Sequence, residues 1–438
     1  MIKRILYTLL IMFPVVASAQ INTDRVMAIG RNALYFEDYV LSIQYFNQVI
    51  NAKPYLSDPY FYRGLAKINL DDFQGAESDC SEAIERNPFV VSAYQVRGLA
   101  RIQQNNFAGA IEDYTKALEF APENIGVWHN MALCRIRQED YKGAKNDLDK
   151  LIAISPRYTK AYLMRGEVDL KQKDTLAAEK DFGKAIEIDR YDADTWASRA
   201  ILRLQQQRYK DAEADFDHAI RLSTRNSGVY INRALARYHQ NNLRGAMSDY
   251  DIALDIDPNN FIGHYNRGLL RAQVGDDNRA IQDFKFVIEM EPDNMMAIFN
   301  RGLLLDQTGD YKGAIKDYST VINEYPNFLL GYQYRAQARR KIGDVKGADA
   351  DEFKVLKAQL DKQNGVDPNK QTADNTENNK TRKKSDKNMN NYRKIVVADN
   401  EEGEEKYKSD YRGRVQDKNV NIVPQPMFVL TYYEKHDD

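Results

Sequence analysis

The sequence predicts an all-α fold, a solenoid in which one helix pair is repeated ten times. Two observations predict it. The chain of 438 residues contains only 23 glycines and 12 prolines, and its helix-forming residues are spread evenly along it. Prolines recur at a spacing of 34 residues or a multiple of 34, at Pro54, Pro88, Pro122, Pro156, Pro258, Pro292 and Pro326. A fixed period of this length is typical of units that bury their apolar faces on one another.

Ten units follow one another without insertion, and each is expected to hold two amphipathic helices. The eighth residue of every unit is small, as at Gly98, so that the two helices can approach closely. The twentieth is alanine in nine units and is expected to be the opposing contact. Aromatic residues recur at the fourth position, and the proline ends the second helix. The units are 23–56, 57–90, 91–124, 125–158, 159–192, 193–226, 227–260, 261–294, 295–328 and 329–362.

This pattern resembles the tetratricopeptide repeat, which has an aromatic residue at position 4, a small residue at 8, alanine at 20, an aromatic at 24 and proline at 32. The match covers residues 23–362. The resemblance implies a right-handed α-α superhelical solenoid whose concave surface is lined by the first helix of each unit. It also implies a non-catalytic protein that binds other proteins or peptides.

Opposite charges return once per unit. Arginine occupies position 7 in eight units, including Arg267 and Arg301, and aspartate occupies position 23 in nine, including Asp283 and Asp317. We interpret them as a structural ladder of partly buried pairs. An arginine-lined channel for anions is the alternative, but it would not require a matched aspartate, and an unpaired buried charge costs several kcal/mol. The sequence leaves open whether each arginine pairs within its own unit or with the preceding one.

The concave positions carry the candidate binding site. Asparagine stands at position 6 as Asn130, Asn232, Asn266 and Asn300. An amide offers a donor and an acceptor, which suits the backbone of an extended peptide. Apolar residues surround these amides and would supply burial; alternatively, they pack between units while the asparagines cap or solvate. They are Ile231, Leu235, Tyr238, Tyr265, Leu269, Phe299 and Leu303.

The two ends of the chain differ from the repeats. Residues 1–19 read as a signal peptide, with a basic start, a short apolar run and small residues before Gln20. A membrane anchor is the alternative, but the apolar run is about half of the roughly 20 residues that a span requires. We therefore expect export, to the periplasm of a Gram-negative bacterium, with association to the outer membrane as a further option.

The C-terminal region is expected to be a disordered polar linker at 366–391, followed by a short-strand tail at 392–438. Residues 426–435 form the most apolar segment of this tail. They are expected to add to a partner's sheet edge or to form a small sheet with the earlier segments, and we rank docking in the solenoid's own groove lower.

Several functions are excluded by what the sequence lacks. Lys and Arg number 62 against 64 Asp and Glu, which gives no reason to propose nucleic acid as a partner. No metal-ligand spacing, phosphate loop or catalytic constellation is present, so we expect no cofactor, no metal and no enzyme activity. Beyond the N-terminus no segment reads as a membrane span. Cys80 and Cys134 fall at apolar repeat positions and are expected to be buried thiols.

The sequence therefore predicts a protein-interaction scaffold that holds extended peptides or partner proteins in its concave groove. The alternative is a rigid structural subunit of a cell-envelope or outer-membrane-associated assembly that docks through the C-terminal tail.

Overall fold

The computed structural model describes residues 22–222, 225–363 and 388–398. Within these ranges the chain forms twenty α-helices and one short 3-10 helix, and no strand, which confirms the predicted all-α repeat fold. The signal peptide predicted at 1–19 and the tail segment 426–435 lie outside the described residues. The helices are α2 Thr23–Tyr35, α3 Tyr39–Ala52, α4 Asp58–Ile68, α5 Phe73–Arg86, α6 Val91–Gln103, α7 Phe107–Phe120, α8 Ile125–Arg137, α9 Tyr141–Ile154, α10 Thr159–Lys171, α11 Thr175–Ile188, α12 Ala193–Gln205, α13 Tyr209–Arg221, α14 Ser227–His239, α15 Leu243–Ile256, α16 Phe261–Gln273, α17 Asp277–Met290, α18 Met295–Thr308, α19 Tyr311–Glu324, α20 Leu329–Lys341 and α21 Val345–Gln363.

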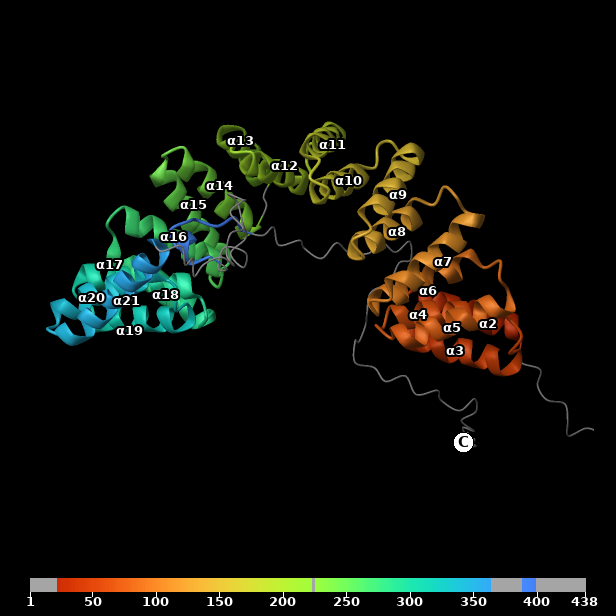
Figure 1. Cartoon of the computed structure of the whole chain (residues 1–438). Coiled ribbons are helices and arrows are strands. Elements are labelled where there is room, and N and C mark those ends of the chain that lie inside the picture. The colour runs from red at the N-terminus through yellow and green to blue at the C-terminus, as the bar shows by residue number, and fades with distance from the viewer. Residues whose placement is uncertain (1–21, 223–224, 364–387, 399–438) are drawn as a thin grey trace, which may run out of the picture. The chain divides into compact units, whose positions relative to one another are not determined.

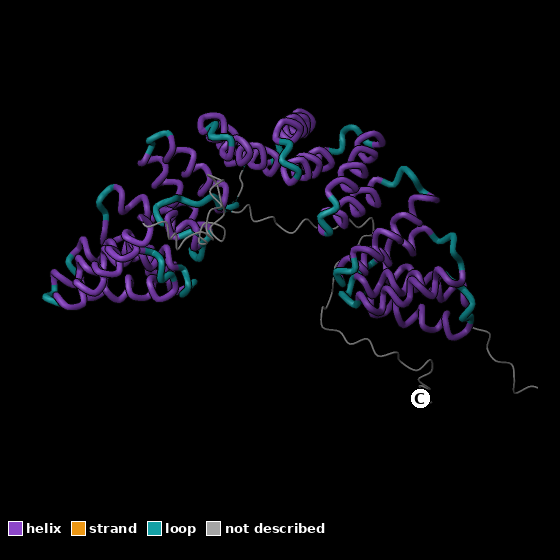
Figure 2. Tube along the Cα trace, in the orientation of Figure 1, coloured by secondary structure: helices purple, strands orange, loops and turns teal. Residues whose placement is uncertain are grey.

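Contacts divide the described chain into two units. Helices α2–α10 belong to the first, and α11–α21 belong to the second together with the 3-10 helix Met389–Asn391. Inside each unit, consecutive helices pack against one another as hairpins joined by short loops (Figures 1 and 2). Every described helix is too short or too polar to be a candidate membrane span.

A left-handed residue turns the chain between the two helices of each repeat. This residue is a glycine in the last three repeats, with φ of +81° at Gly275, and a non-glycine residue in the other seven, with φ of +60° at Asn105. An aspartate or asparagine usually follows and caps the second helix, because its side chain accepts the N–H three residues further on; Asn106 accepts the amide of Gly109 in this way. The turn and the cap together fix where each second helix begins.

The small residue at position 8 makes room for a side chain of the second helix. An added Cβ at Gly98 would lie 2.8 Å from the ring of Tyr114, and one at Gly302 would lie 2.9 Å from the ring of Tyr318. The close contact is therefore made mainly by position 24, and the expectation that alanine at position 20 opposes the glycine is corrected. An aromatic ring is the larger of the two side chains, so it occupies the space that the missing Cβ leaves.

The charge ladder is formed within repeats. Arg301 donates from Nε to a carboxylate oxygen of Asp317 at 2.8 Å, and its second nitrogen reaches the other oxygen at 2.7 Å. Asp317 is 3% exposed, so this two-point pair holds a charge that would otherwise be buried alone. The same pairing recurs in Arg63–Asp79, Arg97–Asp113, Arg199–Asp215, Arg233–Asp249, Arg267–Asp283 and Arg335–Asp351.

In five of these seven arginines the third nitrogen joins neighbouring repeats. Arg267 donates from Nη1 to Asp251 of the preceding repeat at 2.8 Å, and Arg97 donates from Nη1 to the hydroxyl of Ser81 at 3.1 Å. One guanidinium thus spans its own repeat and the one before it. Its planar set of N–H groups is suited to such bridging, and a lysine would not reproduce it.

A second row of cations, at position 11, was missed from the sequence. Arg271 donates to Asp283 at 2.7 Å, and Arg237 donates both to Asp249 at 2.9 Å and to Glu213 of the preceding repeat at 2.8 Å. In the fifth repeat this position holds an aspartate, Asp169. There the preceding repeat supplies the cation, Lys145, at 2.5 Å. Compared with the pair of Arg237 and Glu213, the acidic and basic residues have exchanged places, and the ion pair between repeats is kept.

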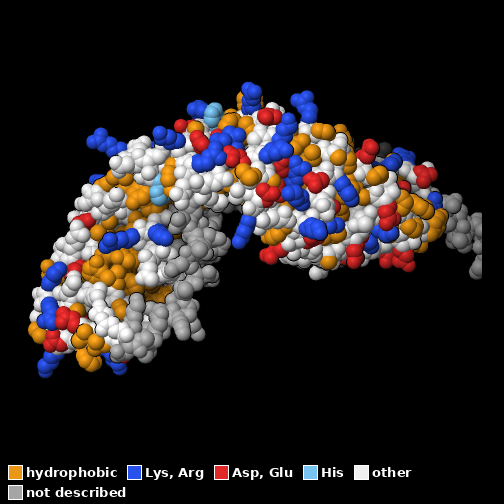
Figure 3. Space-filling view, turned by 45° about the horizontal axis from the view of Figure 1, so that its top comes forward, with side chains coloured by type: hydrophobic (Ala, Val, Ile, Leu, Met, Phe, Trp, Pro, Cys, Tyr) orange, Lys and Arg blue, Asp and Glu red, His pale blue; other side chains and the backbone are white. Residues whose placement is uncertain are grey.

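The ladder is incomplete in the fourth repeat, where position 7 is Met131. Burial raises the pKa of Asp147 to about 6, against the opposing charge of Arg135. At Asp283, burial also acts to raise the pKa, but hydrogen bonds from His264 and Arg267 hold it below the ordinary value. Acidic and basic side chains are interspersed on the face drawn in Figure 3. The two cysteines, Cys80 and Cys134, are buried free thiols, as predicted.

Replacing Gly98 with alanine is expected to destabilise the fold. The added Cβ would meet the Tyr114 ring at 2.8 Å, and such overpacking costs about 1–3 kcal/mol, more than the roughly 1 kcal/mol that alanine gains over glycine in a helix. Urea unfolding measures the change. Gly183→Ala is the matched control, because its nearest neighbour is the end of Arg199 at 3.9 Å, and it is expected to stabilise. Equal stabilisation by both variants would contradict the packing argument.

Completing the ladder with Met131→Arg is expected to change how stability depends on pH. In the native chain the folded state keeps the Asp147 proton between about pH 4 and 6 while the unfolded state has lost it, so the free energy of unfolding falls as pH rises through this window. The Met131 sulfur lies 4.0 Å from the hydroxyl of Thr115 in the preceding repeat. The equivalent residue of another repeat, Ser81, accepts from the guanidinium of Arg97, so an arginine side chain at 131 has a path to follow. A guanidinium there would lower the pKa of Asp147 and reduce that fall.

Urea unfolding at pH 4, 5, 6 and 7 tests this change, with Met131→Leu as the apolar control. The same pH dependence in Met131→Arg and Met131→Leu would show that the arginine does not reach the carboxylate.

Candidate peptide-binding groove

Three buried asparagines line one side of the second unit. Asn232, Asn266 and Asn300 lie at the same position of α14, α16 and α18, one in each of three successive repeats. Their exposed fractions are 0%, 0% and 5%. A buried side-chain amide has to find partners for both its N–H and its C=O groups, because leaving them unmade costs about 1–3 kcal/mol each.

The partners are backbone groups of the chain's own residues 388–398. Asn266 donates to the carbonyl of Val396 at 2.7 Å and accepts the N–H of the same residue at 2.9 Å. Asn232 makes the same pair of bonds with Ala398, at 3.3 and 3.0 Å. The N–H and the C=O of each side-chain amide thus bind the C=O and the N–H of one backbone residue.

The contact at the third asparagine differs. Asn300 donates to the carbonyl of Tyr392 at 2.6 Å and also to the carbonyl of Met296 in its own helix at 2.9 Å. The N–H of Tyr392 is already used, because it donates to Met389 at 3.3 Å and closes the 3-10 turn. The hydroxyl of Tyr265 supplies a second donor to the Tyr392 carbonyl, at 2.9 Å.

Apolar side chains of the segment alternate between two clusters. Val396 and Ala398 are buried in the cluster that contains Tyr265 and Phe299, whereas Val397 is buried in the cluster that contains Leu235. This alternation is the period-two pattern of an extended chain. An extended chain buried on both faces explains why all three residues are less than 10% exposed.

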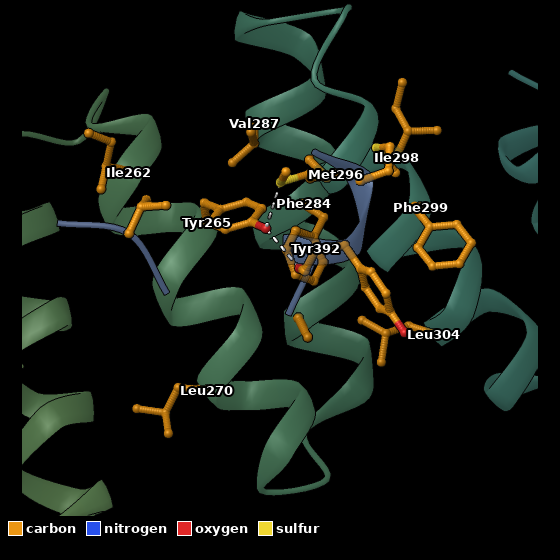
Figure 4. Packing of buried hydrophobic residues seen from close by; sticks show 14 of the residues in the cluster. Ile262, Tyr265, Leu270, Phe284, Val287, Met296, Ile298, Phe299, Leu304 and Tyr392 are labelled. Atoms are coloured by element: carbon orange, nitrogen blue, oxygen red, sulfur yellow. Dashed lines mark hydrogen bonds between the residues drawn. The ribbon is translucent and has the colours of Figure 1, made fainter. Parts of the chain in front are cut away.

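The tyrosine of the segment occupies the far end of the groove. The ring of Tyr392 lies edge-on to Phe299, with centroids 4.8 Å apart, and also edge-on to Phe328, with centroids 6.4 Å apart. Figure 4 shows Tyr392 among Tyr265, Phe299 and Met296, with the Tyr265 hydroxyl directed at its backbone. Aromatic edge-to-face contacts of this kind add about 0.5–1.5 kcal/mol beyond the buried area.

The structure brings most of the predicted groove residues together. Four of them are buried, namely Ile231, Leu235, Tyr265 and Phe299. The other three are partly buried and pack against the cluster that contains Tyr265 and Phe299; these are Tyr238, Leu269 and Leu303. Asn130 is buried in α8 of the first unit, so it is not part of this group. The ladder residues Arg267 and Arg301 lie next in sequence to Asn266 and Asn300, but they bind Asp283 and Asp317.

The residues that sequence reasoning missed are those of the segment itself. Residues 388–391 were assigned to the disordered linker, yet they are ordered here, with Met389 buried and a 3-10 helix at Met389–Asn391. The residues after them, expected to form a strand, contain no strand and lie in the groove. The ranking of docking modes was made for residues 426–435, which lie outside the described residues, so it stays a prediction. Four apolar residues in a row after a polar stretch, "IVVA", were the available signal.

The segment 388–398 carries two charged side chains. Arg393 and Lys394, its two cations, are exposed. Among the described residues no group of three His, Cys, Asp or Glu side chains is placed to hold a metal ion. The arrangement is suited to holding a peptide backbone and apolar side chains.

Comparisons with known proteins agree with the repeat. Family models of the tetratricopeptide repeat match residues 91–124, 125–158, 159–192, 198–261 and 265–327. A search among curated proteins finds no match.

Solved structures of repeat proteins are also similar. A tetratricopeptide repeat protein from Parabacteroides merdae is 21% identical over 57% of this chain and 98% of its own, with a TM-score of 0.45. The C-terminal part of a repeat-containing protein from Cytophaga hutchinsonii is 18% identical over 54% and 97%, with a TM-score of 0.46. The pilF protein of Pseudomonas aeruginosa is 20% identical over 46% and 92%, with a TM-score of 0.41. These similarities are too distant to say what this chain binds.

The family models together match just over half of the chain. Three of the matched ranges begin with the first helix of a pair and enclose the pair, as at α6–α7 and α8–α9, and the other two begin inside α12 and α16. The chain belongs to the tetratricopeptide repeat family.

Proposed function

We propose that this protein is a non-catalytic scaffold whose second unit binds an extended segment of a partner protein in the groove of α14, α16 and α18. Tetratricopeptide repeat proteins bind other proteins or peptides. The observation that carries the proposal is the pair of two-point contacts by which Asn266 and Asn232 hold the backbone of Val396 and Ala398. In this proposal, a partner's backbone would bind the same two side-chain amides.

Apolar burial and hydrogen bonds contribute differently to binding in this groove. Burying a valine, isoleucine or tyrosine side chain contributes about 1.5–3 kcal/mol, so the apolar floor supplies most of the binding free energy. Each backbone hydrogen bond adds only about 0.5–1.5 kcal/mol, but a misplaced peptide would leave a buried amide unsatisfied. The asparagines therefore set where along the groove the backbone lies.

A rigid structural subunit of a cell-envelope assembly is the second candidate. One observation favours it: residues 388–398 contact three successive repeats and would staple them together. In that case, replacing Tyr392 by alanine and Val396 by aspartate would lower the melting temperature strongly, and the vacated groove would bind no peptide. Under the scaffold proposal the same double variant keeps its helices and gains an accessible groove.

We also propose that the protein is exported and acts in the periplasm, on the strength of the basic, apolar and small-residue regions of residues 1–19. N-terminal sequencing of the mature protein from a periplasmic fraction, beginning at Gln20, is the expected result. A chain that retains residues 1–19 in the cytoplasm would overturn the localisation but not the groove.

The groove is tested by peptide binding to the full chain carrying Tyr392→Ala and Val396→Asp. A fluorescent peptide of sequence NMNNYRKIVVA, residues 388–398, is expected to bind, with affinity followed by anisotropy. Adding Asn266→Ala removes both bonds to one residue and is expected to weaken binding roughly 5- to 150-fold, which corresponds to about 1–3 kcal/mol.

Asn259→Ala, in an exposed loop, is the matched control and should leave the affinity unchanged. If Asn266→Ala binds the peptide as tightly as the control, the asparagines do not read the backbone and the proposed site is wrong.

A further inference from the structure

We propose that the groove selects a particular pattern in its partner: an aromatic residue, two residues of any kind, three consecutive aliphatic residues and a small residue. This rests on the proposed function and names the class of ligand. Residues 392–398, "YRKIVVA", carry the pattern and occupy the groove as an internal copy of it. Partner binding then requires this segment to leave.

The first element of the pattern is set by an aromatic pocket. Tyr392 is 8% exposed and is packed edge-on to Phe299, with Phe328 on another side. Its carbonyl accepts from both Tyr265 and Asn300, so the backbone is fixed at the point where the ring enters. An aliphatic side chain would fill less of this pocket and lose the edge-to-face contacts.

The two residues that follow are free. Arg393 and Lys394 are exposed, and the guanidinium of Arg393 lies 5.3 Å from the ring of Tyr392 on the segment itself. The pattern therefore places no requirement on these two positions, and their positive charge is not what the groove reads.

The last four residues are all constrained, because the extended chain is enclosed on two sides. Val396 and Ala398 are 2% and 3% exposed in one cluster, and Ile395 and Val397 pack on the other. Polar side chains would be buried without partners at either face. At 398 a larger side chain would overpack the cluster, at a cost of about 1–3 kcal/mol.

The contacts also define direction. The segment passes α18 at Tyr392, α16 at Val396 and α14 at Ala398, so it runs opposite to the order of the repeats. Asn232 and Asn266 bind residues two apart, which an extended chain separates by roughly 6–7 Å. A reversed sequence would place the aromatic residue at α14, where the pocket of Phe299 and Phe328 is absent.

The internal copy lowers the apparent affinity for any partner. If the segment is docked in about 99% of molecules, a partner meets an open groove in one molecule of a hundred, and its apparent affinity falls about 100-fold. The wild-type chain should therefore bind the peptide NMNNYRKIVVA more weakly than the chain carrying Tyr392→Ala and Val396→Asp.

The test measures anisotropy of five labelled peptides on the full chain carrying Tyr392→Ala and Val396→Asp. They are the parent NMNNYRKIVVA, its Tyr392→Ala, Lys394→Ala and Ala398→Leu derivatives, and the reversed sequence. The parent and Lys394→Ala are expected to bind within about twofold of each other. Tyr392→Ala is expected to lose roughly 30-fold, equivalent to about 2 kcal/mol of burial, Ala398→Leu roughly 5-fold or more, and the reversed peptide nearly all binding.

The outcomes separate the pattern from the function beneath it. Equal binding by all five peptides would overturn the pattern and leave a groove that binds peptides. Binding by none would remove the proposed function as well. If wild-type chains instead dimerise in light scattering and Tyr392→Ala with Val396→Asp abolishes the dimer, the occupant is the segment of a second copy, which also overturns the proposal.

Discussion

A carboxylate is buried at the same place in nearly every repeat, and the need to pair it determines how the repeats stack. The aspartates at position 23 lie almost entirely out of water, and eight of the nine form an ion pair with an arginine of their own repeat. Many of these arginines also reach the preceding repeat. Burying an ion pair adds little net stability, but breaking one is costly. A shift in the stacking of the repeats would break several pairs at once. The main effect of the ladder is therefore to select one stacking register, and its contribution to net stability is small.

That register is what makes the groove possible. Asn266 and Asn300 each precede a ladder arginine, so the helix that places the guanidinium at its aspartate also places the amide at the concave surface. Because the three repeats that contain α14, α16 and α18 stack in the same way, their three amides line up along one path. The three amides can then bind an extended backbone at several points along its length, which the amide of a single repeat cannot do.

Much of this arrangement was predictable from the sequence, and the reasons are physical. The 34-residue period predicted the helix pairs, since each pair repeats the same burial requirement. A charge paired once per unit predicted the ladder, but a pattern of two residues cannot say which repeat supplies the partner, and the second cation at position 11 was hidden among ordinary surface arginines. The exchange of Asp169 and Lys145 shows that the pair matters more than the sign at either position.

The segment in the groove was the part that sequence alone did not place. In isolation, its short apolar run cannot be told apart from that of a strand. The position of the segment is decided by buried side-chain amides elsewhere in the chain, which would lack hydrogen-bond partners without it. Their burial is a property of the fold. Asn232 and Asn266 became interpretable only when Ala398 and Val396 were seen against them.

The central claim is that buried asparagines hold an extended backbone in this groove, and amide hydrogen exchange in the wild-type chain tests it most directly. The N–H groups of Val396 and Ala398 donate to Asn266 and Asn232, so they should exchange slowly. Protection of Val396 should be lost in Asn266→Ala while the amides of α16 and α18 keep theirs. Rapid exchange of both amides in the wild-type chain would contradict the account.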